Sequence, residues 1–334
     1  MRVVTQSTTL PPLTLRALQP ADCDRLLTWI ESSDALWQWS GPRSFTWPLD
    51  RGQLLRDLAA RAQSGGLLAG VDAGGEMVAH VLIEAQRHHG LGHIGRVAVD
   101  PRRRGGGLGV ALMRATARHA FDDLGLHRLQ LTVYTFNAPA LATYRAVGFA
   151  VDGVARESTL GSGGRWDGVT MSLLEPDYRH PLTYGDGIRL ASPRDADAVA
   201  ELLTELGYPH DREHAAAQLL AWMAEAHGEV LVAQAGDGAA VGVVAVHRVP
   251  SFERPGAFAR VLALSVGAGQ RRAGVGRRLM AAAERWAAAH GCTVVEVTSL
   301  RSREDAHAFY RALGYTDRCA ESGRLIRSLD LAGG

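Results

Sequence analysis

The chain has 334 residues, 46% of them apolar and 21% charged, which is ordinary for a folded globular protein and long enough for about two domains. Its 36 basic and 35 acidic residues leave a net charge of +1, so we expect neither nucleic acid nor an anionic membrane as the main partner. Every basic residue is arginine. The absence of lysine excludes lysine Schiff-base chemistry, a Walker phosphate loop and a Ser-Lys dyad.

Cysteine usage and hydropathy suggest a compartment. The three cysteines, Cys23, Cys292 and Cys319, are odd in number and form no CxxC pair, as is typical of a reducing environment. The first 13 residues lack an apolar core of signal-peptide length, and no run of about 18 apolar residues occurs. We therefore expect a cytoplasmic protein with no membrane contact.

Periodicity and turn residues predict a mixed α/β domain in the first half of the chain. In chain order, the expected elements are a strand (13–18), two helices (20–32, 50–63), three strands (67–71, 77–85, 93–99), a helix whose face carries Leu108, Leu112, Ala115 and His119, a strand (129–134) and a helix (139–147). Gly148 directly follows the last helix, as expected of a helix C-terminus.

The second half repeats this order. Its expected elements are strands at 188–190, 230–235, 240–247 and 260–266, a helix with Val275, Leu279, Ala282 and Trp286 on one face, a strand at 294–298 and a helix at 305–313. Proline and glycine are frequent between 176 and 187, where they interrupt regular structure. We place the domain boundary there and predict domains at 1–178 and 179–334.

Two segments of the first half recur in the second. Residues 97–113 match 264–280 at a separation of half the chain length, and Tyr144-Arg-Ala-Val-Gly-Phe149 matches Tyr310-Arg-Ala-Leu-Gly-Tyr315 at nearly the same separation. Solenoid repeats have periods of about 20–50 residues, so this period indicates duplication of a whole domain. The fold class predicted is α/β (mixed α+β), used twice.

A glycine-rich loop joins a strand to a helix in each half, as Arg104-Gly-Gly-Gly-Leu-Gly109 and Arg271-Arg-Ala-Gly-Val-Gly276. Glycine lets a ligand approach the backbone, and the free N–H groups of the helix that follows favour an anion such as a pyrophosphate. The dinucleotide pattern GxGxxG fails because its last position holds Val110, Leu112 or Leu279. What remains in both copies is Arg-x-x-Gly-x-Gly.

This pattern resembles motif A of the GCN5-related N-acetyltransferases (GNAT). The resemblance covers nearly all of both halves, because a Val-x-Val or Leu-x-Val strand precedes each loop, an amphipathic helix and a second strand follow it, and a tyrosine stands before Gly-aromatic. It implies two tandem GNAT domains, each a central mixed sheet flanked by helices. It also implies acetyl-CoA or another acyl-CoA as the co-substrate.

Matching the family's motif residue by residue implies a cofactor site in each half. In the first half the implied positions are Val97, Val99, Arg104, Gly105, Gly107, Leu108, Gly109 and Asn137. In the second half they are Leu264, Val266, Arg271, Arg272, Gly274, Val275 and Gly276. The second half has Arg303 in place of the asparagine, and Arg272 and Ala273 in place of glycines, so the first half fits the family better.

The resemblance implies that Tyr144 and Tyr310 protonate the departing CoA thiolate. A phenol with a pKa of roughly 10 can donate a proton to the thiolate of a thiol whose pKa is roughly 8.5. The alternative is that both tyrosines only pack a helix onto a sheet. Backbone N–H groups of the preceding strand would stabilise the oxyanion. No carboxylate stands on that strand to accept the amine proton, which leaves Glu84, His93, His247 and Glu253 as candidates.

Three further clusters each have two interpretations. Arg102-Arg-Arg104 is either a solvated turn or a site for the 3′-phosphate of CoA, since three adjacent cations at a helix N-terminus repel one another. The tryptophans at 29, 37, 39 and 47 either line an acceptor pocket or belong to the core. His88, His89 and His93 lack a carboxylate or cysteine frame, so we expect no metal site.

We therefore expect an acetyl-CoA-dependent N-acetyltransferase that acts on a primary amine of a small molecule, with one domain holding acetyl-CoA structurally. One alternative is a non-catalytic acyl-CoA-binding or sensing protein, which the missing base favours. Another is a protein N-terminal or side-chain acetyltransferase, because residues 137–149 and 164–172 resemble the branch that acetylates ribosomal proteins. We expect a monomer or a homodimer.

Overall fold

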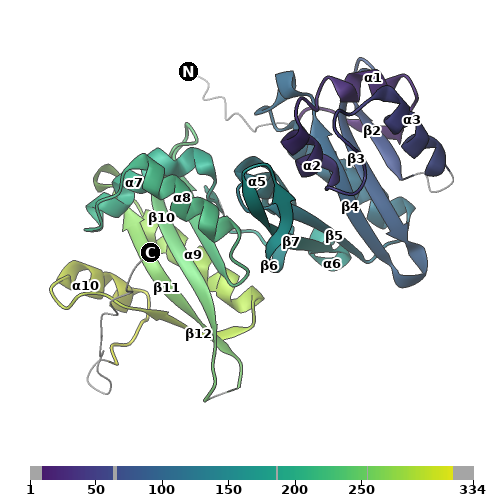
Figure 1. The fold of residues 1–334 in the computed structure, drawn as a ribbon. Helices are drawn as coiled ribbons and strands as arrows, with labels where there is room; N and C mark the ends of the chain where they lie inside the picture. The colour runs from purple at the N-terminus through teal and green to yellow at the C-terminus, as the bar shows by residue number, and fades with distance from the viewer. Residues whose placement is uncertain (1–9, 63–65, 186, 254, 319–334) are drawn as a thin grey trace.

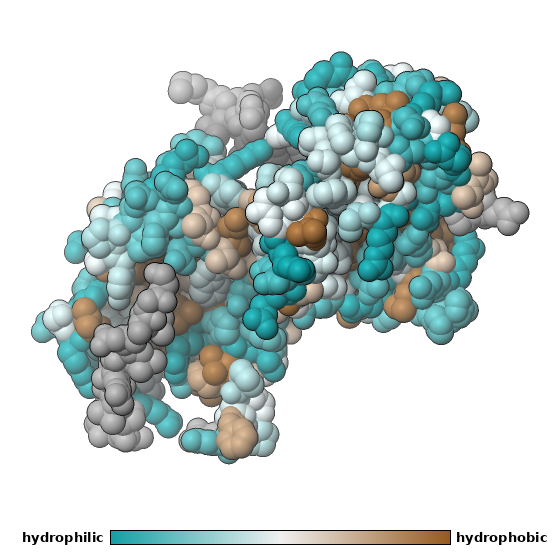
Figure 2. Space-filling model, viewed as in Figure 1, coloured by the Kyte–Doolittle hydropathy of each residue, from teal (hydrophilic) through white to brown (hydrophobic). Residues whose placement is uncertain are grey.

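The computed structural model describes residues 10–62, 66–185, 187–253 and 255–318. Within them the chain forms two β-sheets, of seven and five strands, each with helices on both faces (Figure 1). We call the part with the seven-stranded sheet the N-terminal domain and the part with the five-stranded sheet the C-terminal domain. Figure 2 shows that the viewed face is mainly hydrophilic, with hydrophobic residues in small separate areas.

The N-terminal sheet has the strand order β1-β2-β3-β4-β5-β7-β6. Its strands are β1 (Thr14–Ala17), β2 (Leu67–Val71), β3 (Met77–Gln86), β4 (Leu91–Val99), β5 (Arg128–Tyr134), β6 (Ala150–Gly161) and β7 (Gly164–Leu174). Its helices are α1 (Asp22–Leu27), α2 (Ser33–Ser40), α3 (Arg51–Ala60), α4 (Leu108–Arg118), α5 (Ala138–Val147) and α6 (Glu175–Arg179). Only β4 and β5 run parallel; the other described pairs are antiparallel.

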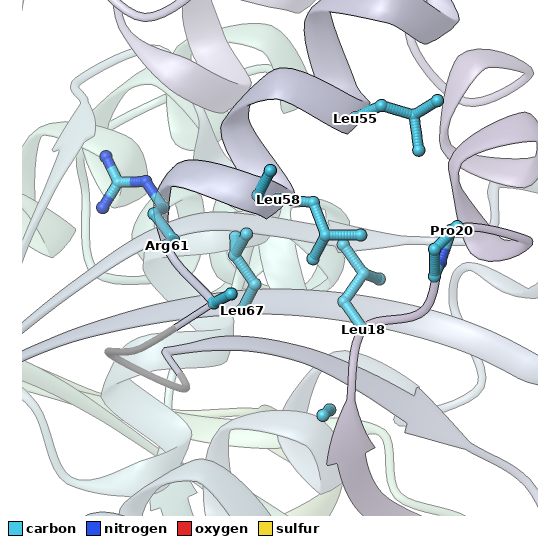
Figure 3. A pocket seen from close by; sticks show the side chains of 9 residues that line it. Leu18, Pro20, Leu55, Leu58, Arg61 and Leu67 are labelled. Atoms are coloured by element: carbon cyan, nitrogen blue, oxygen red, sulfur yellow. The ribbon is translucent and has the colours of Figure 1, made fainter.

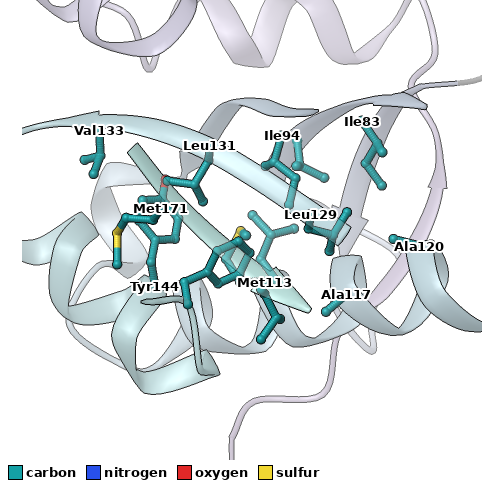
Figure 4. Packing of buried hydrophobic residues seen from close by; sticks show 14 of the residues in the cluster. Ile83, Ile94, Met113, Ala117, Ala120, Leu129, Leu131, Val133, Tyr144 and Met171 are labelled. Atoms are coloured by element: carbon teal, nitrogen blue, oxygen red, sulfur yellow. The ribbon is translucent and has the colours of Figure 1, made fainter. Parts of the chain in front are cut away.

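Both faces of this sheet are covered, which is why β2 is buried along its whole length. Helices α1, α2 and α3 pack on one face around Leu26, Leu36 and Leu54. Helix α4 covers the other face with Leu112, Met113 and the residues that follow them, and α5 packs beside it (Figure 4).

The C-terminal sheet has the order β12-β11-β10-β9-β8, with β11 and β12 parallel. Its strands are β8 (Ile188–Leu190), β9 (Gly228–Gln234), β10 (Ala240–Pro250), β11 (Ala257–Val266) and β12 (Cys292–Val297). Its helices are α7 (Ala196–Glu205), α8 (Arg212–Met223), α9 (Val275–Ala289) and α10 (Glu304–Ala312). Helices α7 and α8 pack on one face and α9 on the other.

The domains meet where α5 lies against α8 and against the short helix η4 (Pro193–Asp195) (Figure 1). The boundary that we predict between residues 178 and 179 falls in the last turn of α6, and it stays a proposal. In the part of the chain that the structure describes, no helix is both long and apolar enough to cross a membrane. Cys23 and Cys292 are free thiols, and Cys319 lies outside the described residues.

One expected helix is wrong in length. Instead of a single helix over 20–32, α1 stops at Leu27, and α2 begins after Ser32, whose hydroxyl accepts the N–H of Ala35 at 3.1 Å. That cap marks a helix start that periodicity did not distinguish from a continuing helix. Helices α7 and α8 and strand β6 were also not predicted. Helices α7 and α8 pack against β9 and β10, and Met223 of α8 also belongs to the core of the N-terminal domain.

Candidate functional site

Strands β4 and β5 separate halfway along their length. They pair from Leu91 with Arg128 to Ile94 with Leu131, and there the pairing ends although both strands continue. The cause is a bulge at Arg96, whose φ is +53°, where β4 also shifts its register against β3. Beyond Ile94, one edge of β4 therefore has no partner strand among the residues that the structure describes.

The N–H groups of Val97 and Val99 face this open edge. The N–H of Asp100 donates to Val78 O on β3 at 2.9 Å, and alternate residues of a strand direct their N–H groups to opposite sides. The second domain resembles this in part: Gly267 N–H donates to Val241 O at 3.0 Å, and β12 ends at Val297, where its pairing with Val261 of β11 ends. The N–H groups of Leu264 and Val266 therefore face away from β10, on the side where no described strand pairs with them.

The loop that follows β4 needs two glycines. Gly105 and Gly107 have φ of +85° and +81°, and Gly107 is the residue before the first turn of α4. A Cβ on Gly107 would also lie 3.2 Å from Leu10 Cδ2. The free N–H groups of the first turn, at Leu108 and Gly109, are thus presented beside a backbone without side chains. The Leu108 side chain is buried, so its contact with an anion would be through its N–H.

The second loop has the same backbone conformation without the first glycine. Arg272 has φ of +64° and Gly274 has φ of +77°, which matches Gly105 and Gly107 in turn. A side chain in the left-handed region costs about 1–2 kcal/mol. The second loop therefore keeps the shape of the first, with backbone strain at Arg272. Helix α9 begins at Val275, which is buried like Leu108.

Two of the three adjacent arginines of the first loop are paired with carboxylates of the protein. Arg102 pairs with Asp100 at 2.7 Å, and Arg103 pairs with Asp72 at 2.6 Å and Glu76 at 3.0 Å. These carboxylates relieve the repulsion from which we inferred a 3′-phosphate site. Arg104 is exposed and forms no side-chain hydrogen bond or ion pair with a described residue, so its charge is available to a ligand.

The second loop has its main cation already neutralised. Arg271 pairs with Glu205 of α7 at 2.9 Å, and its Nε donates to Val266 O at 3.1 Å. Glu205 also accepts the N–H of Ala268 at 3.4 Å, so a carboxylate stands against this loop. The arginine that matches Arg104 in the second loop is therefore already paired with a carboxylate, whereas Arg104 pairs with no described residue.

Gly109 and Gly276 permit close packing of two helices. A Cβ on Gly109 would lie 3.3 Å from Thr143 Cγ2 of α5, and one on Gly276 would lie 3.2 Å from Phe309 Cζ of α10. Asn137 precedes α5, and its side chain accepts the N–H of Ala140 at 3.3 Å. The equivalent Arg303 precedes α10 with nearly the same φ and ψ but caps nothing.

The two tyrosines differ in burial. Tyr144 belongs to the core beneath the N-terminal sheet, where it lies near Leu131 and Met171 (Figure 4), and its hydroxyl makes no hydrogen bond to a described residue. Tyr310 is half-buried against Phe309 and Tyr315 on α10, a helix with no fully buried residue. Burial raises the pKa of both phenols, so both stay protonated at neutral pH.

The tryptophans divide between the two interpretations. Trp29 and Trp39 are core residues and Trp47 is nearly half-exposed. Trp37 meets Trp166 of β7 edge to face at 6.5 Å between ring centroids. Trp166 also contacts two rings that the sequence analysis missed, Tyr134 and Phe136, at 4.9 Å and 5.2 Å. We call these four rings (Trp37, Tyr134, Phe136, Trp166) the aromatic cluster; Asn137 directly follows it at the open end of β5.

Arg96 is a further residue that sequence reasoning missed. Its side chain is buried, pairs with Asp57 of α3 at 3.1 Å between Nη2 and Oδ1, and lies 4.7 Å from the ring centroid of Phe45. Trp39 Nε1 donates to Arg96 O at 2.9 Å. These contacts hold the bulge open. An arginine in the middle of a mainly apolar strand was the available signal.

The base candidates stand in different surroundings. Glu84 pairs with Arg61 at 2.5 Å, and His93 lies directly opposite Glu84 in the ladder, three residues before Arg96. His247 Nε2 is 3.6 Å from Glu225 Oε1, and Glu253 is exposed. His93 is therefore the candidate nearest along β4 to the point where the strands separate.

An apolar pocket of about 380 Å³ lies apart from both loops (Figure 3). Its walls come from α3 and from the strands and turns around β1 and β2, with Leu18, Leu55, Leu58 and Leu67 among the lining residues. It has neither the open strand edge nor the loop N–H groups. We do not count it as part of the site.

The chain is similar in sequence to known proteins. The sequence model of the Acetyltransferase (GNAT) family matches residues 29–149 and 196–315, one match in each domain. A mycothiol acetyltransferase of Pseudarthrobacter chlorophenolicus is 37% identical over 110 residues, which are 30% of this chain and 34% of that protein. The L-amino acid N-acetyltransferase AaaT of Escherichia coli is 32% identical over 120 residues, 35% of this chain and 73% of that protein.

One further relative and one solved structure match a larger share of the chain. A mycothiol acetyltransferase of Salinispora tropica is 33% identical over 153 residues, 42% of this chain and 47% of that protein, so the chain spans less than half the length of these mycothiol relatives. Among solved structures, a spermidine N-acetyltransferase from Vibrio cholerae in complex with CoA and spermine covers 50% of this chain and 98% of its own, at 20% identity and a TM-score of 0.45.

Proposed function

Because this chain belongs to the acetyltransferase (GNAT) family, we propose that it transfers an acetyl group from acetyl-CoA to a primary amine of a small molecule. We propose further that the N-terminal domain is the half that binds acetyl-CoA for the reaction. The observation that carries this choice is the unpaired Arg104 beside the loop of Gly105 and Gly107, because Glu205 already neutralises Arg271 in the other loop.

The open edge of β4 suits the thioester. The diphosphate would lie on the N–H groups of Leu108 and Gly109, and the pantetheine arm along β4. When the amine nitrogen bonds to the acetyl carbon, the carbonyl oxygen becomes an oxyanion, for which the N–H groups of Val97 and Val99 are preorganised donors. The C–S bond then breaks, and the thiolate leaves with the electron pair.

Tyr144 is the proposed proton donor to that thiolate. The raised pKa of the phenol keeps it protonated but also makes it a weaker acid in water. A thiolate released in the same desolvated place has its own pKa raised, which brings the two groups closer in acidity. The proton that the amine loses would pass through a water molecule to His93, which is the candidate base.

The aromatic cluster is the proposed wall of the acceptor site. Its four rings stand where β5 ends, and Phe136 is 43% exposed. Aromatic faces attract both apolar groups and cations, so an amine that carries an apolar or a second cationic group would fit. This is the basis for proposing a small molecule rather than a protein terminus.

A matched pair of charge insertions tests which domain binds acetyl-CoA. A Cβ on Gly106 would meet only Arg103 O, at 3.9 Å, and the equivalent residue Ala273 already carries a side chain. Gly106→Asp therefore places a negative charge in the first loop without a clash, and Ala273→Asp does the same in the second. We expect Gly106→Asp to weaken acetyl-CoA binding by more than about tenfold in calorimetric titration, and Ala273→Asp to leave it unchanged.

The outcomes separate the alternatives. Wild-type protein that binds no acetyl-CoA would refute the proposed function. A loss with Ala273→Asp alone would move the site to the C-terminal domain. Binding without thiol release above hydrolysis, across a panel of small primary amines, would favour a binding protein over an enzyme.

A further inference from the structure

An arginine of the C-terminal domain touches the diphosphate loop of the N-terminal domain. Arg194, in η4, donates from Nη2 to Gly105 O at 3.1 Å. The same nitrogen lies 3.7 Å from the position that a Cβ on Gly105 would take. Arg194 is exposed, and no described carboxylate pairs with it. A guanidinium carries five N–H donors, so this contact leaves donors free beside the loop.

The segment that carries Arg194 is held rigidly. Ser192 and Asp195 form a reciprocal capping box, and Asp195 pairs with Arg189 at 2.6 Å. The domain that carries it is also held, because Arg145 of α5 binds both carboxylate oxygens of Glu229 at 2.8 and 2.9 Å. The position of Arg194 over Gly105 is therefore set by a packed interface between the domains.

Arg194 has no counterpart in the first domain. There the same turn recurs, with Arg16 paired to Asp22 at 2.6 Å and the N–H of Gln19 donating to Asp22 at 2.7 Å. The residue before Asp22 is Ala21. The position before the aspartate thus holds an arginine only in the copy of the turn that faces the other domain's loop.

We propose that Arg194 supplies a second cation, beside Arg104, for the diphosphate of acetyl-CoA, so that the C-terminal domain completes the cofactor site of the N-terminal domain. This inference rests on the proposed function. Two guanidinium groups without carboxylate partners would then face two phosphate charges, a match that favours charge-assisted hydrogen bonds. The contact to Gly105 O orients the side chain for that role before the ligand arrives.

The test is Arg194→Gln, whose amide can still donate to Gly105 O but carries no charge. Calorimetric titrations would compare three ligands: CoA, 3′-dephospho-CoA and S-acetylpantetheine. Dephospho-CoA keeps the diphosphate, and S-acetylpantetheine has neither the diphosphate nor the 3′-phosphate. We expect roughly tenfold weaker binding of CoA and dephospho-CoA and unchanged binding of S-acetylpantetheine. The matched control is Arg212→Gln, which removes an exposed arginine of the same domain that pairs with Asp197 and should change nothing.

Each other result overturns the inference in a recognisable way. Wild-type affinity for CoA in Arg194→Gln would refute it and leave the proposed function standing. An equal loss for all three ligands would mean that the substitution disturbs the whole site and that Arg194 makes no specific contact with the diphosphate. A loss for CoA but not for dephospho-CoA would assign Arg194 to the 3′-phosphate. A wild-type protein that binds none of the ligands would remove the proposed function together with this inference.

Discussion

Arg145 and Glu229 form a buried ion pair across the two domains, with Nη1 2.9 Å and 2.8 Å from the two carboxylate oxygens and side chains only 9% and 15% exposed. The same guanidinium also donates to the carbonyl oxygens of Met223 and Glu225 at 2.8 and 3.0 Å, at the end of α8. Since Arg145 directly follows Tyr144 in α5, the helix that carries the proposed proton donor is anchored to the other domain.

Removing this arginine should destabilise the protein and uncouple the domains. Arg145→Met leaves Glu229 buried without its partner, which typically costs about 3–5 kcal/mol. Thermal and denaturant unfolding should show a lower midpoint and two separate transitions. Arg311→Met is the matched control, because Arg311 occupies the same motif position on α10 but is exposed. A loss below about 1 kcal/mol in Arg145→Met would contradict a coupling role.

The two tyrosines should differ in their effect on turnover. We expect Tyr144→Phe to lower kcat by about a hundredfold, the usual scale for losing a general acid, and Tyr310→Phe to leave it near wild type. Stability should hardly change in Tyr144→Phe, because the lost hydroxyl makes no hydrogen bond to a described residue. Thiol release under saturating acetyl-CoA measures both variants, and equal activity in all three proteins would reject the proton-donor role.

Relieving the strained arginine of the second loop should stabilise the C-terminal domain. Arg272→Gly removes a side chain from φ of +64°, for an expected gain of about 1 kcal/mol in the free energy of unfolding, reduced by the greater freedom of glycine in the unfolded chain. Gly105→Ala, at φ of +85° in the first loop, should shift the denaturant midpoint the other way. If Arg272→Gly destabilises, its side chain makes a contribution that outweighs the strain.

His80 should make stability depend on pH in the acid range. Burial lowers its pKa to about 4, and its Nδ1–H donates to Leu68 O at 2.9 Å. Between pH 6.5 and 4 the unfolded chain takes up a proton that the folded protein does not, so stability falls as pH falls through this window. The full effect is about 3 kcal/mol below pH 4.

The measurement is denaturant unfolding at several pH values in wild type and His80→Asn. The asparagine amide can still donate to Leu68 O but does not titrate, so its stability should vary less with pH across the window. Identical pH slopes in the two proteins would mean that His80 is protonated in the fold.

Local chemistry explains how far sequence reasoning reached. A glycine loop between a strand and a helix determines its own conformation within a few residues, so both loops were recognisable, and the structure places even Arg272 in the predicted turn. The duplication was readable because both copies keep the same order of elements. The helix break at Ser32 and the bulge at Arg96 were not, because a cap and a strand slip depend on single contacts that periodicity does not record.

The amino-acid order alone specifies two copies of one domain, each with a loop suited to a diphosphate, since short-range backbone preferences suffice for that. The packed fold adds the charge partners that distinguish the copies further. Glu205 against Arg271, Glu229 against Arg145 and Arg194 against Gly105 join residues 66, 84 and 89 positions apart. These contacts form only when whole helices and sheets pack together, so no local sequence pattern predicts which residues will be paired.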